Sequence, residues 1–162
     1  MDVLSEQLLN LWNHLNQCNV KYIMVGGLAT NFNGYSRITE DIDIWIENEL
    51  QNRKNLRTAF RNAGYGDNPL LETIEFVPGW TAFHIADGIE LDILTSMKGL
   101  EHLSFDECLQ DASVADIDGI KIPFLHINQL IANKKVINRP KDQVDVMELE
   151  KIKKIREEND KD

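Results

Sequence analysis

The chain has 162 residues, enough to bury a hydrophobic core without disulfide bonds or structural metals. Its formal net charge of −10, from 27 acidic and 17 basic residues, disfavours an extended nucleic-acid groove because phosphates would be repelled. No signal peptide and no membrane-spanning apolar run is recognisable, so a cytoplasmic protein is expected. We expect one domain over residues 1–155 and a disordered polar tail over 156–162.

Helices and strands alternate in the first part of the chain. Leucines at helical spacing predict an amphipathic helix over roughly 3–18, and the apolar run 21–25 predicts a short buried strand. This strand leads directly into Gly26-Gly27 and a short helix. Over 42–46, isoleucines alternate with other residues, which predicts a strand with two different faces.

The middle of the chain predicts a helix and a hairpin. The helix spans 49–63, with Leu50 among its expected core positions. The segment NPLLETIEFVPGW that follows is ambiguous. Next, TAFHIADGIELDILT predicts a hairpin whose turn is Asp87-Gly88, and the second strand of this hairpin contains Asp92.

The last third predicts further helices around a second hairpin. A helix is expected over 104–112, and SVADIDGIKIPFL predicts a hairpin that turns at Asp118-Gly119. HINQLIANKKVI and KDQVDVMELEKIKKI predict two helices that are separated by a short link ending in a proline. Because strands both alternate with helices and form hairpins, the chain is expected to have an α+β fold with a mixed sheet.

Two carboxylates lie on one face of the strand over 42–46. Asp41 and Asp43 are two residues apart and project together, while the isoleucines face the core. Mg²⁺ prefers such oxygen ligands, and a third carboxylate is available in ELDILT, where Asp92 is preferred and Glu90 is the reserve candidate. The alternative interpretation is that these acids are ordinary charges on a solvated strand face.

The glycine pair favours the metal interpretation. Gly26-Gly27 stands between a strand and a helix, where the backbone can approach a ligand closely and helix N–H groups favour phosphate. The three pieces VGG at 25–27, DIDI at 41–44 and LDI at 91–93 together resemble the nucleotidyltransferase superfamily, whose fold includes the palm of DNA polymerase beta. The C-terminal residues resemble more loosely the abortive-infection and minimal nucleotidyltransferases of bacteria.

This resemblance implies a fold and a site. The fold would be a mixed sheet with helices packed mainly on one face. Asp41 and Asp43 would bind Mg²⁺ and a nucleoside triphosphate, and Gly26 and Gly27 would cradle its phosphates. Asp92 would act as general base for the acceptor hydroxyl or as a ligand of a second metal, which makes a two-metal site the expectation.

Three further residues are candidates for nucleotide binding. Arg37 could reach a phosphate and Thr39 could fix the loop before the carboxylates, although a solvated loop is an equal alternative. Lys134 could face the triphosphate or could simply end a helix. Asp142 and Asp145 are expected to pair with the nearby bases rather than to bind metal.

The leading functional prediction is Mg²⁺-dependent transfer of a nucleoside monophosphate to a hydroxyl. The acceptor could be a small molecule, as in antibiotic resistance, or a protein or an RNA, as in toxin–antitoxin modules. The alternative is a binding, antitoxin or regulatory module with little catalysis. A homodimer or a partner protein is compatible with either function. Trp80 is expected in the core or beside an acceptor pocket.

Overall fold

The computed structural model describes residues 6–39, 41–86 and 88–161. Helices and strands alternate along the described chain in the order α1 (Glu6–Gln17), β1 (Tyr22–Val25), α2 (Gly26–Phe32), β2 (Asp41–Ile46), α3 (Leu50–Ala63), the 3-10 helix η1 (Pro69–Glu72), β3 (Ala82–Ala86), β4 (Ile89–Leu94), α4 (Phe105–Asp111), β5 (Ser113–Ile117), β6 (Ile120–Phe124), α5 (Ile127–Ile137) and α6 (Pro140–Asn159).

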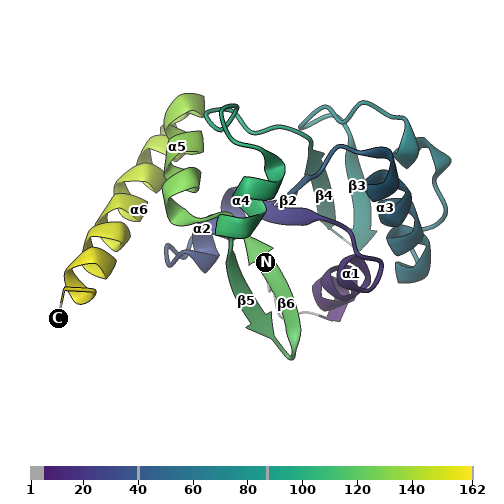
Figure 1. Cartoon of the computed structure of the whole chain (residues 1–162), viewed down its shortest axis with the longest axis horizontal. Coiled ribbons are helices and arrows are strands. Elements are labelled where there is room, and N and C mark those ends of the chain that lie inside the picture. Colours follow the sequence, from purple (N-terminus) through teal and green to yellow (C-terminus); the bar gives the residue numbers. More distant parts are fainter. Residues whose placement is uncertain (1–5, 40, 87, 162) are drawn as a thin grey trace.

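The strands form one mixed sheet in the order β3-β4-β2-β1-β6-β5. β2 pairs in parallel with β4 and antiparallel with β1, so it lies at the centre beside both. β3–β4 and β5–β6 are the two predicted hairpins. In Figure 1, α1 and α3 lie together at one end of the molecule, and α5 and α6 lie together at the other. The predicted α+β fold with a mixed sheet is confirmed.

The two faces of β2 have different environments. Ile42, Ile44 and Ile46 are fully buried on one face, where the core continues to α1 through the stacked rings of Trp12 and Tyr22. Asp41, Asp43 and Trp45 lie on the opposite face. Trp45 is covered there by Phe105 of α4, with ring centroids 5.1 Å apart. The carboxylates are therefore on the face opposite the isoleucines, as the alternation predicts.

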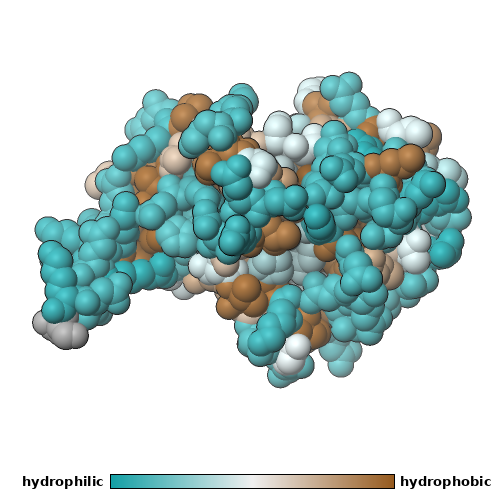
Figure 2. Space-filling model, in the orientation of Figure 1, coloured by the Kyte–Doolittle hydropathy of each residue, from teal (hydrophilic) through white to brown (hydrophobic). Residues whose placement is uncertain are grey.

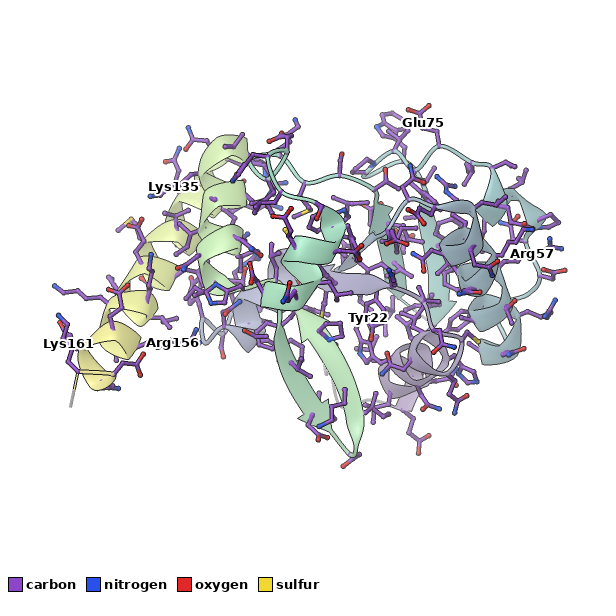
Figure 3. The ribbon with its side chains drawn as sticks, in the orientation of Figure 1. Tyr22, Arg57, Glu75, Lys135, Arg156 and Lys161 are labelled. Atoms are coloured by element: carbon purple, nitrogen blue, oxygen red, sulfur yellow. The ribbon has the colours of Figure 1, made fainter. Side chains whose placement is uncertain are left out.

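The long helix α6 is anchored near both of its ends. At its start, Asp142 and Asp145 are buried against α5. Near its end, Arg156 donates from Nη2 to the carbonyl of Asn33 at 2.7 Å, just after α2. Figure 3 labels Arg156 at this crossing. Most of the α6 surface visible in Figure 2 is hydrophilic, while Val146, Leu149 and Ile152 of the same helix belong to or pack against the core.

Several sequence expectations are corrected. Leu50, expected in the core, is the first residue of α3 and has 57% of its surface exposed. Residues 156–159 of the tail expected to be disordered continue α6, and Arg156 among them contacts the Asn33 carbonyl. The ambiguous segment after α3 contains η1. The turn residue Asp87 lies outside the described residues. None of the described helices is long and apolar enough to span a membrane.

Candidate active site

The parallel pairing of β2 with β4 brings the predicted carboxylates together. Asp43 is directly opposite Asp92, and Asp41 is directly opposite Glu90. Neighbouring strands lie about 4.8 Å apart, so the paired side chains leave the same face of the sheet side by side. Of the two candidates on β4, Asp92 is therefore the one beside Asp43. Glu90 is nearer the exposed end of the row, where His84 Nε2 lies 3.5 Å away.

Asp43 is held against the glycine pair. Gly26 has φ +67, and a Cβ added to it would collide with the Asp43 carboxylate. Only glycine permits both this backbone conformation and this approach. Burial, together with the charges of Asp92 and Asp41, raises the pKa of Asp43 to about 6, although the charge of Lys134 partly offsets this effect. The site thus holds a carboxylate whose negative charge is incompletely neutralised.

Asp92 has two differently bound oxygens. Its Oδ2 accepts a hydrogen bond from the Gly79 backbone N–H at 2.9 Å. Its Oδ1 is buried and has no well-aligned hydrogen-bond partner among the described residues. Burial raises the pKa of Asp92, and the backbone N–H groups of Gly79 and Ile93 oppose that rise. One oxygen is therefore fixed in place while the other remains available to a ligand or a proton.

The loop between α2 and β2 packs onto the second glycine. A Cβ on Gly27 would lie 2.5 Å from Thr39 Oγ1 and 3.4 Å from Arg37 Nη2. Thr39 Oγ1 donates to the Asp41 carbonyl at 3.2 Å, and the Arg37 backbone N–H donates to Asn31 Oδ1 at 3.1 Å. Thr39 therefore fixes the loop, as predicted, and Arg37 lies over the first turn of α2.

A buried ion cluster joins this loop to the C-terminal helices. Lys134 Nζ lies 2.8 Å from Asp145 and 3.5 Å from Asp142, and all three side chains are at most 4% exposed. Asp145 also contacts Arg37, at 2.9 Å. Asp142 accepts from Arg139 Nε at 2.6 Å. The prediction that the two acids pair with bases is confirmed, and Lys134 is an interior residue rather than a solvated helix end.

The charges of this cluster extend to the carboxylate row. Burial would raise the pKa of Asp142, but hydrogen bonds from Arg139 hold that pKa below its usual value. The pKa of Arg139 is raised in turn, chiefly by Asp142 and also by the charge of Asp43. Lys134 and Lys141 both favour the ionised form of Asp43. The basic side of the site is therefore built by α5 and α6.

The carboxylate row suits a divalent cation. Asp43 and Asp92 are adjacent, the Asp92 Oδ1 lacks a well-aligned partner in the described part of the chain, and each carboxylate is disfavoured in its charged form. A hard cation with oxygen ligands would relieve these features. Among residues 6–39, 41–86 and 88–161, no three His, Cys, Asp or Glu side chains converge closely enough to enclose a metal by themselves. Part of the coordination would thus come from phosphates or water.

The sequence profile of a protein family described as nucleotidyl transferase of unknown function (DUF2204) matches residues 4–161. The chain belongs to this family. Its fold is that of the nucleotidyltransferase superfamily, as the three motifs predict. No curated protein matches the chain.

Solved nucleotidyltransferases share this fold at low sequence identity. The lincosamide antibiotic adenylyltransferase LnuA, crystallised with lincomycin, has a TM-score of 0.59 and 17% identity over 91% of this chain and 98% of its own. ANT(2")-Ia in complex with adenylyl-2"-tobramycin has a TM-score of 0.54 and 17% identity over 92% of each chain. An antigenic nucleotidyltransferase-like protein from Paracoccidioides brasiliensis has a TM-score of 0.55 and 20% identity over 86% of this chain and 71% of its own.

In this nucleotidyl transferase family member, the fold collects most of the predicted site residues around β2. Asp41, Asp43 and Asp92 share one face, Gly26 touches Asp43, and the loop that carries Arg37 and Thr39 covers Gly27. Lys134 influences Asp43 through its charge but is held by two acids of α6.

Sequence analysis missed Gly79, whose N–H fixes Asp92. The Pro-Gly pair at 78–79 indicated a turn, but nothing in the sequence placed that turn beside β4.

Proposed function

We propose that the chain transfers a nucleoside monophosphate from a Mg²⁺-bound nucleoside triphosphate to a hydroxyl group of an acceptor. The observation that carries this proposal is the direct pairing of Asp43 with Asp92, with Gly26 pressed against Asp43. An adjacent pair of incompletely neutralised carboxylates beside a glycine turn suits phosphates that arrive with a divalent cation.

The proposed nucleotide end of the site uses residues from three segments. The absence of side chains at Gly26 and Gly27 lets Asp43 and Thr39 pack directly against the turn where the phosphates would bind. Arg37 and Lys134 would supply positive charge from the cluster that they share with Asp145, and Thr39 would keep the connecting loop in place. Asp41, Asp43 and Asp92 are the residues that would hold one or two Mg²⁺ ions, which would neutralise charge on the phosphates.

The proposed transfer forms a bond between the acceptor oxygen and the α-phosphorus and breaks the bond from the α-phosphorus to the pyrophosphate group, which leaves. The hydroxyl proton passes to Asp92. Its Oδ1 suits that role because it is buried without a well-aligned partner in the described chain, and the Gly79 N–H keeps the other oxygen from rotating into its place. A raised pKa makes a carboxylate a better proton acceptor than an exposed Asp.

A small hydroxyl-bearing molecule is the acceptor that we favour. The net charge of −10 disfavours binding along nucleic acid. Two of the matched structures, one with lincomycin and one with adenylyl-2"-tobramycin, are antibiotic-modifying nucleotidyltransferases that span nearly the same length. Antibiotic modification is accordingly the first activity to screen, and protein and RNA hydroxyls form the second screen.

Calorimetry and a labelled-nucleotide assay test the proposal. The wild-type chain should bind at least one of ATP, GTP, CTP and UTP in a Mg²⁺-dependent manner and release pyrophosphate with a suitable acceptor. Asp43→Ala should lose both properties. If the wild type binds nucleotide but transfers it to no acceptor in either screen, the binding or regulatory function becomes the better account. If it binds no triphosphate with Mg²⁺, the proposal is wrong.

A further inference from the structure

The Arg37 side chain lies between the glycine turn and the C-terminal helix. Its Nε is 2.9 Å from Asp145 Oδ1, and its Nη2 is 3.4 Å from the position that a Cβ on Gly27 would occupy. Only 23% of the side chain is exposed. The guanidinium therefore contacts α6 through Nε and places Nη2 beside the turn where the phosphates are proposed to bind.

The contact with Asp145 does not use up the donors of Arg37. The buried Nε–H has no aligned hydrogen-bond acceptor, so the 2.9 Å contact is a charge contact rather than a directed hydrogen bond. Among the described residues, Nη1 donates to the Ile38 carbonyl alone, at 3.5 Å. A guanidinium has five N–H donors arranged to bind two oxygens of one phosphate. Arg37 is thus held in place while, among the described residues, most of its donors have no acceptor.

The cluster also has more bases than acids. Among the described residues, the ion pairs of Arg37, Lys134 and Arg139 are with Asp142 and Asp145, although the chain as a whole is strongly acidic. Lys134 is buried, whereas Arg37 and Arg139 keep 23% and 53% of their side chains exposed, so an anionic ligand would find accessible positive charge at this cluster. This positive charge acts on Asp43, because the charge of Lys134 favours the ionised form of the Asp43 carboxyl group.

We propose that Asp145 is a positioning residue of the nucleotide site, which holds Arg37 over Gly27 so that the guanidinium binds the triphosphate. This inference rests on the proposed function. The inference gives α6 a part in the nucleotide site, because Asp145 of this helix contacts both Arg37 and Lys134. Asp145 and Arg37 are some hundred residues apart in the sequence. Arg37 touches the phosphate, and Asp145 acts only through it and through Lys134.

The opposite role for the same ion pair predicts an opposite result. If Asp145 competed with phosphate for Arg37, removing its charge would free the guanidinium and tighten nucleotide binding. If Asp145 positions Arg37, removing its charge lets a flexible side chain leave the turn, so binding weakens. The direction of the change in affinity separates the two roles.

The experiment measures Kd for ATP with Mg²⁺, and for inorganic triphosphate, in Asp145→Asn, Arg37→Gln and the double variant. Each single change should raise Kd for both probes about tenfold or more. The double variant should show much less than the product of the two effects, because Asp145 acts partly through Arg37. KM for the triphosphate should rise in parallel, while kcat at saturation changes less.

Glu150→Gln is the matched control. It removes an acid that pairs α6 with α5 through Lys135 at 2.8 Å, but that pair is exposed, and Lys135 lies at the outer edge of α5 in Figure 3. Its Kd should equal that of the wild type. If Asp145→Asn does not fold, Asp145→Glu keeps the charge but moves it by one methylene group, and a severalfold rise in Kd is expected from the displaced guanidinium.

Three results would overturn the inference. The first is an unchanged Kd in the Asp145 variants, and the second is a lower Kd in them. The third is a rise in Kd of the double variant that equals the product of the two single rises. If the wild type binds ATP while these results appear, only the positioning role is wrong. If the wild type binds neither probe, the proposed function is wrong together with it.

Discussion

The molecule contains two pairs of neighbouring carboxylates, one buried and one partly exposed, and their surroundings differ. Asp142 and Asp145 lie among three basic side chains, and Asp142 has a lowered pKa. Asp43 and Asp92 face each other across two parallel strands, and both have raised pKa values. The first pair is compensated by the protein itself. The second, which we call the uncompensated pair, is offset only in part by Lys134 and Lys141, as expected if it serves the ligand that we propose rather than stability.

The largest effect should follow from changing the uncompensated pair. Asp43→Asn keeps the shape of the side chain but removes the charge, so we expect nucleotidyl transfer to fall by about 10³-fold or more. Steady-state kinetics with the acceptor found by screening measures this loss. Glu90→Gln, on the same face but opposite Asp41, is the control and should lose far less. Comparable losses in the two variants would contradict the assignment of Asp92 over Glu90.

The compensated pair should instead respond in stability. Lys134→Ala leaves Asp142 and Asp145 buried without their shared partner, which should lower the free energy of unfolding by about 3–5 kcal/mol. Chemical denaturation at neutral pH measures it. Lys135→Ala, which removes an exposed ion pair from the next position of the same helix, should cost less than about 1 kcal/mol. Equal costs would mean that the buried cluster contributes no more than a surface pair.

The glycine beside the uncompensated pair should show an intermediate effect. Gly26→Ala places a methyl group against the Asp43 carboxylate at φ +67, so we expect a loss of about 2–3 kcal/mol in stability together with weakened nucleotide binding. Gly119→Ala is the control, because its φ of +83 is similar but no atom lies near its added Cβ. It should cost about 1 kcal/mol and leave binding unchanged. Equal behaviour of the two variants would argue against a close approach at Gly26.

The two carboxylate pairs were not equally predictable from sequence. Alternation along β2 places Asp41 and Asp43 on one face because successive strand residues point in opposite directions. Asp92 lies about fifty residues away, and its position opposite Asp43 depends on the parallel register of β2 and β4, which no local pattern encodes. Only the family motif linked the two segments in advance.

Other features depended on tertiary contacts that are invisible in the local sequence. Leu50 has the spacing of a core residue, but it is the first residue of α3, and its side chain is exposed to solvent there. The polar end of α6 has a composition typical of disorder, yet Arg156 secures it to the end of α2. The pairing of Asp145 with Lys134 was predicted from proximity in sequence, whereas its contact with Arg37 required the whole fold.

The most direct test of the central claim is the free energy of unfolding as a function of pH, for the wild type and Asp43→Asn. The pKa of Asp43 is raised from 3.8 to about 6, so its contribution to stability is present below pH 4 and is lost as the pH rises through 6. That change corresponds to about 3 kcal/mol. Asp43→Asn should therefore lose less stability than the wild type between pH 4 and 8.

Adding Mg²⁺ with ATP at pH 8 completes this measurement. It should stabilise the wild type by mass action and should have little effect on Asp43→Asn. The account therefore predicts a pH-dependent, ligand-responsive wild type and a variant that is more stable than the wild type at pH 8 without ligand. Parallel pH profiles, or equal stabilisation of both proteins by Mg²⁺ with ATP, would contradict the claim that Asp43 and Asp92 form an uncompensated pair that is completed by a cation and a nucleotide.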